Sequence, residues 1–141
     1  MALEALIKDL RAEGHRITKV RRAVLSQIIS ASGPLSALQL LAALKQGELI
    51  VNKTTVYREI DFLKEAKLVR EVDLLDGTKR YELLEEGSHH HHLVCTNCRK
   101  VQCVEMQNDL DALERRVGRK YRFQIQSHVL EFFGRCSDCK I

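Results

Sequence analysis

The stretch from Asn52 to Leu84, NKTTVYREIDFLKEAKLVREVDLLDGTKRYELL, decides the fold of the first part of this 141-residue chain. Asn52 is a favoured N-cap residue, and the positions after it divide between two faces of a helix. The apolar face is formed by Val56, Ile60 and Leu63. The opposite face, at spacings of three and four residues, is formed by Thr54, Tyr57, Arg58 and Asp61. We therefore expect a helix that packs its apolar face inward and leaves Tyr57 and Arg58 outside.

Three further helices are expected before Asn52. Apolar residues recur at helical spacing over residues 2–13, and Thr18 and Ser36 are the expected N-caps of the second and third helices. The dipeptide Gly33-Pro34 separates these two helices, because proline lacks the backbone N–H that a helix interior needs.

Two short strands are expected after the fourth helix, over residues 68–73 and 79–84, joined around Asp76-Gly77. Three or four helices followed by a two-stranded hairpin form a winged helix-turn-helix. In that architecture the helix that carries Tyr57 and Arg58 enters the major groove of DNA, and the hairpin is a wing that contacts the backbone. A helical bundle with an accessory hairpin is the alternative.

Positive charge gathers on the segment from residue 14 to residue 58. This segment contains seven Lys and Arg against one acidic residue, a net charge of +6, whereas the whole chain carries +4. Clustered positive charge is expected of a nucleic-acid-binding surface, although a charge run of this size alone is more often a solvated face. Together with the winged-helix pattern, it favours double-stranded DNA as the partner.

Two Cys-x-x-Cys pairs, Cys95/Cys98 and Cys136/Cys139, predict a metal site in the second part of the chain. Each pair places two thiolates on one tight turn, and two such pairs supply the four ligands of a closed tetrahedral Zn(II) site. Disulfides and redox dithiols are the alternatives. The chain shows no signal peptide and no long apolar run, so we expect a cytoplasmic protein without a membrane partner, where structural disulfides rarely persist.

Four consecutive histidines, His89 to His92, lead into the strand-like residues 93–95. Such a run resembles a purification tag, but tags stand at chain termini. In an extended run successive side chains point to opposite faces, so His89 and His91 would serve one site, and His90 and His92 another. Further along, residues 123–128 alternate like a strand, and Leu110, Leu113 and Val117 keep helical spacing. These patterns predict a small α+β module with metal sites.

Several short motifs, in one order over nearly the whole chain, resemble those of the ferric uptake regulator family of metal-dependent transcriptional repressors. They are Gly14-His15-Arg16-Ile17-Thr18 with Arg21, Thr54-Thr55-Val56-Tyr57-Arg58, Tyr81-Glu82, the histidine run through Cys98, and His128 followed by residues 134–139. The resemblance implies the α+β fold class: a winged-helix DNA-binding domain, residues 1–85, then a small α/β dimerisation domain, residues 86–141, with a four-cysteine zinc site. It also implies a homodimer that bound metal closes onto an AT-rich inverted repeat.

The resemblance assigns ligands and DNA contacts as well. Its structural zinc maps to Cys95, Cys98, Cys136 and Cys139. Its hinge sensing site maps to Glu82, His90, His92 and Cys103. A further site in the dimerisation domain maps to His89, His91, Asp111 and His128. On the DNA side Tyr57 is expected to read base edges and Arg58, Lys53 and Arg21 to hold phosphates, with Thr54 on the same helix face as Tyr57.

Two departures from the family's pattern bear on the sensed metal. Many relatives place a histidine of the DNA-binding lobe in the hinge site, but the matching residues 32–35 contain none. Cys103 stands where relatives often have a carboxylate. A four-coordinate site with sulfur suits Zn(II) better than Fe(II) or Mn(II), so we expect zinc as the regulatory metal, with iron second and manganese third. A merely buried strand cysteine is the alternative for Cys103.

The expected function is that of a metal-responsive repressor of metal-homeostasis genes, without catalysis or a small-molecule substrate. A metal that bridges Glu82 and the histidines would favour one angle between the domains and so shift the population toward the DNA-binding form. The alternatives are a peroxide-responsive regulator of the same family, a zinc storage protein, and a metal-dependent hydrolase with Glu105 or Glu131 as its base. The sequence contains no HExxH signature that would support a hydrolase, and a zinc storage protein would have no use for the basic segment.

Overall fold

The computed structural model of this chain describes residues 3–84, 90–106 and 109–140. The chain divides into two compact units, Met1–Glu86 and Gly87–Ile141, and each is described by itself. The predicted domain boundary falls among residues 85–89, outside the described residues. Within the described ranges, no helix has the length and apolar character that a membrane crossing requires.

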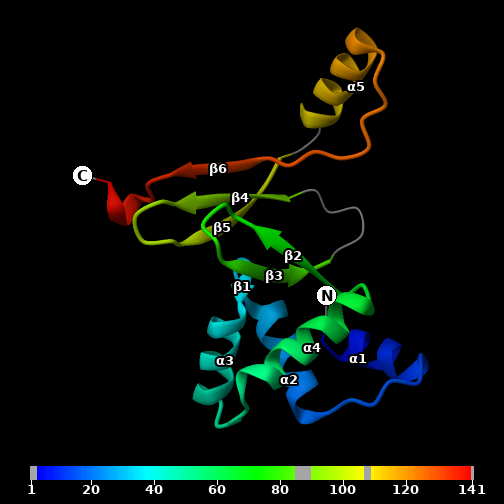
Figure 1. Cartoon of the computed structure of the whole chain (residues 1–141), viewed down its shortest axis with the longest axis vertical. Helices are drawn as coiled ribbons and strands as arrows, with labels where there is room; N and C mark the ends of the chain where they lie inside the picture. Colours follow the sequence, from blue (N-terminus) through cyan, green and yellow to red (C-terminus); the bar gives the residue numbers. More distant parts are fainter. Residues whose placement is uncertain (1–2, 85–89, 107–108, 141) are drawn as a thin grey trace. The chain divides into compact units, whose positions relative to one another are not determined.

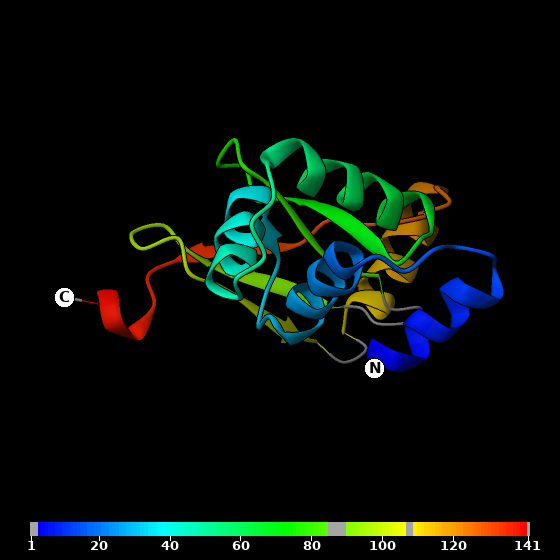
Figure 2. The same ribbon diagram turned by 90° about the horizontal axis from the view of Figure 1, so that it is seen from below.

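In its described residues, the first unit combines four helices with a three-stranded antiparallel sheet of order β1-β3-β2 (Figures 1 and 2). In chain order its elements are α1 (Leu3–Ala12), α2 (Lys19–Ser30), β1 (Leu35–Ser36), α3 (Ala37–Gln46), α4 (Lys53–Glu65), β2 (Val69–Asp73) and β3 (Lys79–Leu83). The hairpin β2–β3 is the wing, and its turn contains Gly77 at a φ of +75°, a value that favours glycine. The predicted winged helix-turn-helix is therefore confirmed.

The predicted N-caps of α2, α3 and α4 are confirmed. The side chains of Thr18, Ser36 and Asn52 each accept a hydrogen bond from the backbone N–H three residues further on, at 3.0, 3.2 and 2.8 Å. Ser36 completes a capping box, because its own N–H donates to Gln39 Oε1 at 2.8 Å. Each cap satisfies an N–H that the helix leaves without a partner, which is typically worth about 1 kcal/mol.

The core of the first unit joins its helices to the sheet. Its most deeply buried side chains include Ile7, Val24, Leu25, Leu40, Val56, Ile60 and Leu63. The three of these that α4 contributes form the apolar face predicted for that helix. Tyr57 and Arg58 lie on its exposed side, so the fold presents them to solvent.

The second unit is built on a three-stranded sheet of order β5-β4-β6 (Figure 1). Its elements are β4 (His90–Cys95), β5 (Val101–Glu105), α5 (Asp109–Tyr121), β6 (Glu131–Gly134) and the short 3-10 turn η1 (Ser137–Cys139). The central strand β4 pairs antiparallel with β5 and parallel with β6. The parallel pairing makes β4 and β6 end at the same edge of the sheet, and each strand leads into one Cys-x-x-Cys pair.

The helix expected around Leu110, Leu113 and Val117 is confirmed as α5, but the strand expected over residues 123–128 is wrong. Those residues pair with no strand in the described part of the chain. Their first N–H, that of Phe123, donates instead to Gly118 O at 2.9 Å and closes the end of α5. The strand begins only at Glu131, where β4 supplies a hydrogen-bonding partner.

Candidate metal centres

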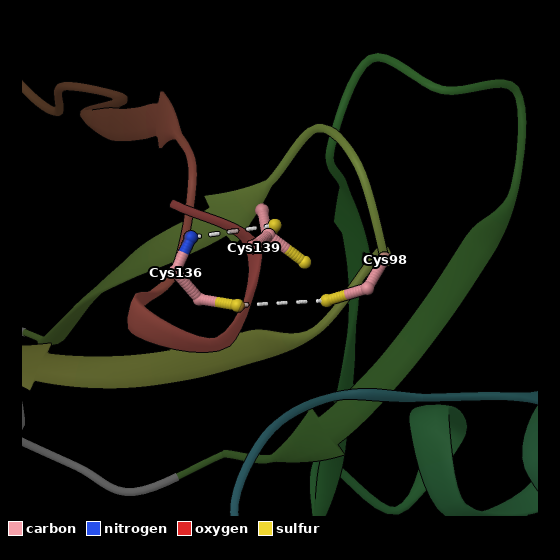
Figure 3. A group of neighbouring side chains, drawn as sticks. Cys98, Cys136 and Cys139 are labelled. Atoms are coloured by element: carbon pink, nitrogen blue, oxygen red, sulfur yellow. Dashed lines mark hydrogen bonds between the residues drawn. The ribbon is translucent and has the colours of Figure 1, made fainter. Parts of the chain in front are cut away.

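Four cysteine sulfurs meet at the edge where β4 and β6 end. Cys95 is the last residue of β4, and Cys98 lies in the turn before β5. Cys136 directly precedes the turn η1, and Cys139 is its last residue. All four sulfur atoms lie within 4.8 Å of one another. Figure 3 shows the sulfurs of Cys98 and Cys136 facing each other, with the dashed line between them. The sheet therefore brings together two pairs that are far apart in sequence.

The spacing of these sulfurs fits a tetrahedral zinc ion. A Zn–S bond of about 2.3 Å in tetrahedral geometry separates two sulfurs by about 3.8 Å, and Cys98 Sγ lies 3.7 Å from Cys136 Sγ. A disulfide would require about 2.0 Å, and these cysteines are free thiols. The Asn97 side-chain amide also donates to Cys139 Sγ at 3.3 Å, as expected around a thiolate ligand.

The surroundings of the cluster shift the pKa values of two of its thiols in opposite directions. Backbone N–H groups of Cys98 and Cys136 stabilise the Cys95 thiolate and lower the pKa of Cys95 to about 6. The backbone N–H of Lys100 lowers the pKa of Cys98, but the neighbouring thiols and burial outweigh it and raise that pKa to about 11. The Cys95 thiolate thus forms readily. Ionisation of further thiols in the cluster is unfavourable unless a bound cation stabilises their negative charge.

A second group of ligand atoms lies on β4 and β5. His90 and His92 share one face of β4, and Cys103 is directly opposite His92 in the antiparallel register. The ligand atoms of these three residues lie within 4.8 Å of one another, and the two imidazole rings meet edge to face, with centroids 5.4 Å apart. We call this group the His90/His92/Cys103 site.

A third group involves the other face of β4. The His91 ring lies 5.4 Å from the His128 ring, centroid to centroid. His91 Nδ1 is 3.0 Å from Leu130 O, while its Nε2 is buried and has no hydrogen-bond partner among the described residues. A buried nitrogen without a partner is costly, and a metal ion on Nε2 would remove that cost.

The carboxylate beside His128 is not the one predicted. Glu114 Oε1 lies 2.6 Å from His128 Nδ1, while Asp111 is exposed on α5. His89 lies outside the described residues. Of the ligands predicted for this site, the structure therefore brings His91 and His128 together.

Glu82, the remaining ligand predicted for the hinge site, belongs to the first unit. It lies on β3 opposite Arg70 of β2, and its Oε1 is 2.6 Å from the Arg70 guanidinium. Its participation in a metal site stays a prediction.

The residues predicted to contact DNA differ in their surroundings. Four of them, Lys53, Thr54, Tyr57 and Arg58, are exposed on α4. Arg21 is instead held inside the first unit, because its Nε lies 2.9 Å from Glu59 Oε2 and its guanidinium lies 3.5 Å from the centre of the Phe62 ring.

The contacts of Glu114 and Glu131 with histidines are not predicted by the sequence. The Glu131 carboxylate lies 3.0 Å from Nδ1 of His92, a residue 39 positions earlier in the chain, and this pairing depends on the register of β6 against β4. The sequence around Glu131 carries no signal of this register.

The fold and these groups define a class: winged-helix proteins whose second unit carries clustered cysteine and histidine side chains in positions suited to metal binding. The model of the ferric uptake regulator family matches residues 12–133, and the chain belongs to that family. The resemblance drawn from the sequence motifs is thus confirmed. It places the chain among metal-responsive regulators of transcription.

Individual relatives cover almost the whole chain. It is 31% identical over 140 residues to the ferric uptake regulation protein of Bacillus subtilis (strain 168), with 97% of this chain and 93% of that protein covered. It is 29% identical over 139 residues to the peroxide-responsive repressor PerR of Staphylococcus aureus (strain USA300), with 98% and 91% covered. The solved structure of a zinc-bound manganese uptake regulator matches with a TM-score of 0.78 and 26% identity, covering 96% of this chain and 99% of that one. The names of these three proteins refer to ferric uptake, peroxide and manganese uptake. Family membership therefore does not decide which signal this chain senses.

Proposed function

We propose that this protein is a zinc-responsive transcriptional repressor of metal-homeostasis genes, which binds DNA when its His90/His92/Cys103 site is loaded. The observation that carries this proposal is the grouping of two imidazoles and one cysteine sulfur, whose ligand atoms lie within 4.8 Å of one another. Sulfur and nitrogen ligands in a set of three or four favour Zn(II), whereas Fe(II) and then Mn(II) prefer more oxygen-rich, higher coordination. The four-cysteine cluster holds a separate structural zinc ion.

Glu82 supplies the coupling between metal and DNA in this proposal. It lies on the wing strand β3, and the histidines lie at the start of the second unit. A metal that takes ligands from both units favours one arrangement of the two. A near-complete switch requires the metal to prefer that arrangement by about 5 kcal/mol, and the protein acts by binding and not by catalysis.

The DNA-binding surface is the exposed face of α4. Tyr57 contacts base edges or thymine methyls, while Arg58 and Lys53 neutralise phosphates and Thr54 lies beside them. A homodimer presents two such helices to the half-sites of an AT-rich inverted repeat, one helical turn or a multiple of it apart. Exposed apolar side chains on the sheet of the second unit, Leu93, Phe132 and Phe133, support self-association.

The peroxide-responsive alternative rests on the similarity to PerR. Cys103 argues against it, because sulfur replaces a nitrogen or oxygen ligand in the site. The hydrolase alternative loses one of its two candidate bases, since the Glu131 carboxylate is hydrogen-bonded to His92.

The decisive experiment measures binding to an AT-rich inverted repeat by protein that is stripped of weakly held metal but retains the zinc of its four-cysteine cluster. Free Zn(II) is buffered, and Fe(II) and Mn(II) are tested without oxygen. We expect Zn(II) to restore tight binding at the lowest free concentration and Cys103→Ala to abolish this response. The matched control is Gln102→Ala, an exposed neighbour on β5, which should respond like the unaltered protein.

Other outcomes have definite meanings. Restoration by Fe(II) with Cys103 dispensable would identify an iron regulator. Irreversible loss of binding after peroxide treatment of the iron-loaded protein would favour the peroxide sensor, and DNA binding that ignores every metal would contradict the allosteric mechanism.

A further inference from the structure

Three histidines of the two imidazole-containing centres use the same ring nitrogen for a protein contact. Nδ1 lies 3.0 Å from Leu130 O in His91, 3.0 Å from Glu131 Oε2 in His92, and 2.6 Å from Glu114 Oε1 in His128. In each ring the other nitrogen is Nε2, the atom through which the ring would bind a metal ion. The acceptor at His91 is a neutral carbonyl, whereas His92, which belongs to the His90/His92/Cys103 site, faces a carboxylate.

The contact between Glu131 and His92 is built into the sheet. Glu131 begins β6 and is the register partner of His92 in the parallel pairing with β4. Its Oε2 accepts the His92 backbone N–H at 3.0 Å, and both carboxylate oxygens lie within 3.1 Å of His92 Nδ1. The side chains of His92 and Glu131 are only 3% and 14% exposed. The carboxylate is thus anchored to the main chain of the residue whose ring it contacts.

This geometry fixes the tautomer of His92. An ionised carboxylate only accepts hydrogen bonds, so the proton of a neutral His92 ring must reside on Nδ1. In that tautomer Nε2 carries the lone pair that a metal ion would take, and the negative charge behind the ring makes that nitrogen a stronger donor. We propose that Glu131 is the positioning residue of the His90/His92/Cys103 site, where it holds the His92 ring with Nε2 presented to the metal.

Two other roles for Glu131 fit the structure less well. A metal ligand would belong to the group of mutually close ligand atoms, and Glu131 is not a member of that group among the described residues. A side chain that only satisfied the His92 N–H would need one oxygen and no ring contact, whereas both Glu131 oxygens face Nδ1.

The inference rests on the proposed function, since it assumes that the His90/His92/Cys103 site takes zinc. The full-length protein, with the zinc of its four-cysteine cluster retained, is titrated with Zn(II) against a chromophoric chelator of known affinity. We expect Glu131→Ala to bind the regulatory zinc about 10–100-fold more weakly, the usual cost of losing such a partner. Glu131→Gln should fall between, because its amide oxygen still accepts the Nδ1 proton but carries no charge.

Glu105→Gln is the matched control, since Glu105 is exposed on β5 of the same sheet and lies outside the group of ligand atoms. Its zinc affinity should equal that of the unaltered protein. If the unaltered protein binds no zinc beyond the ion of the four-cysteine cluster, the proposed function and this inference both fail. If it binds zinc and Glu131→Ala binds it equally well, the role of Glu131 alone is overturned.

The tautomer supplies a readout that a purely structural role would not move. Long-range proton–nitrogen NMR spectra of the metal-free protein should show the His92 proton on Nδ1, and those of Glu131→Ala should show a mixture of tautomers. The spectrum of the unaltered protein decides the question even if Glu131→Ala folds poorly, because a proton on Nε2 there would overturn the proposal.

Discussion

Arg21 and Arg58 show how the surroundings of an arginine decide what its loss costs. Arg21 is 14% exposed, pairs with Glu59 at 2.9 Å and stacks on Phe62, whereas Arg58 is exposed on α4. We expect Arg21→Ala to lower the free energy of unfolding by about 1–3 kcal/mol, because it leaves a mostly buried carboxylate without its partner. Urea unfolding followed by circular dichroism measures this loss.

Arg58→Ala is the matched control for Arg21→Ala. It should change the free energy of unfolding by less than about 0.5 kcal/mol, but weaken binding to cognate and random DNA alike and flatten the salt dependence. Equal stability of the two variants would contradict the packing role of Arg21.

The elements of the first unit follow closely from local sequence. The helix starts are predicted by the N-cap residues Thr18, Ser36 and Asn52. An N-cap hydrogen bond joins residues only three positions apart, so the local sequence is enough to predict it. The two-residue strand β1 was not predicted. It is too short to show an alternating pattern in the sequence, and it is defined by the pairing of Leu35 with Tyr81.

The second unit depends on pairings that local sequence does not record. Residues 123–128 have the alternation of a strand, but a strand also needs a partner, and β4 offers its free edge to residues 131–134 instead. The same register carries Glu131 to His92. Sequence therefore predicts the ligand types and their alternation along β4, but not the carboxylates behind the rings.

We expect the second unit to depend on the proposed structural zinc, because its elements are few. Its sheet is small, and large apolar side chains such as Phe132 and Phe133 remain exposed, so the apolar core alone provides little stability. We expect removal of the zinc from the four-cysteine cluster, by strong chelation or by Cys136→Ala, to lower the Tm of this unit by more than about 10 °C. Differential scanning calorimetry measures the shift.

Ser137→Ala is the control for zinc removal, because Ser137 is exposed in the same turn η1 and supplies no sulfur. It should keep both zinc and Tm. A Cys136→Ala protein with an unaltered Tm would contradict the structural role of the cluster, whereas the transition of the winged-helix unit should stay unchanged throughout.

At the scale of the whole molecule, binding of metal and coupling to DNA are separable properties. The His90/His92/Cys103 site lies within the second unit, while Glu82 belongs to the first. In the proposed mechanism the second unit binds zinc, and Glu82 makes that binding depend on the arrangement of the two units. Linkage requires zinc to tighten DNA binding by the same factor by which DNA tightens zinc binding.

Glu82→Ala should therefore still bind the regulatory zinc, more weakly by one ligand, but lose the coupling. In this variant we expect the factor by which zinc tightens DNA binding, and the equal factor by which DNA tightens zinc binding, to fall toward one. His92→Ala should instead lose the regulatory zinc itself. Zinc affinities with and without operator DNA, and DNA affinities with and without zinc, give the two factors independently. The DNA affinity of Glu82→Ala could instead still rise with zinc as it does in the unaltered protein. That result would place the coupling in contacts other than Glu82, because a ligand shifts an equilibrium only through its differential affinity for the two states.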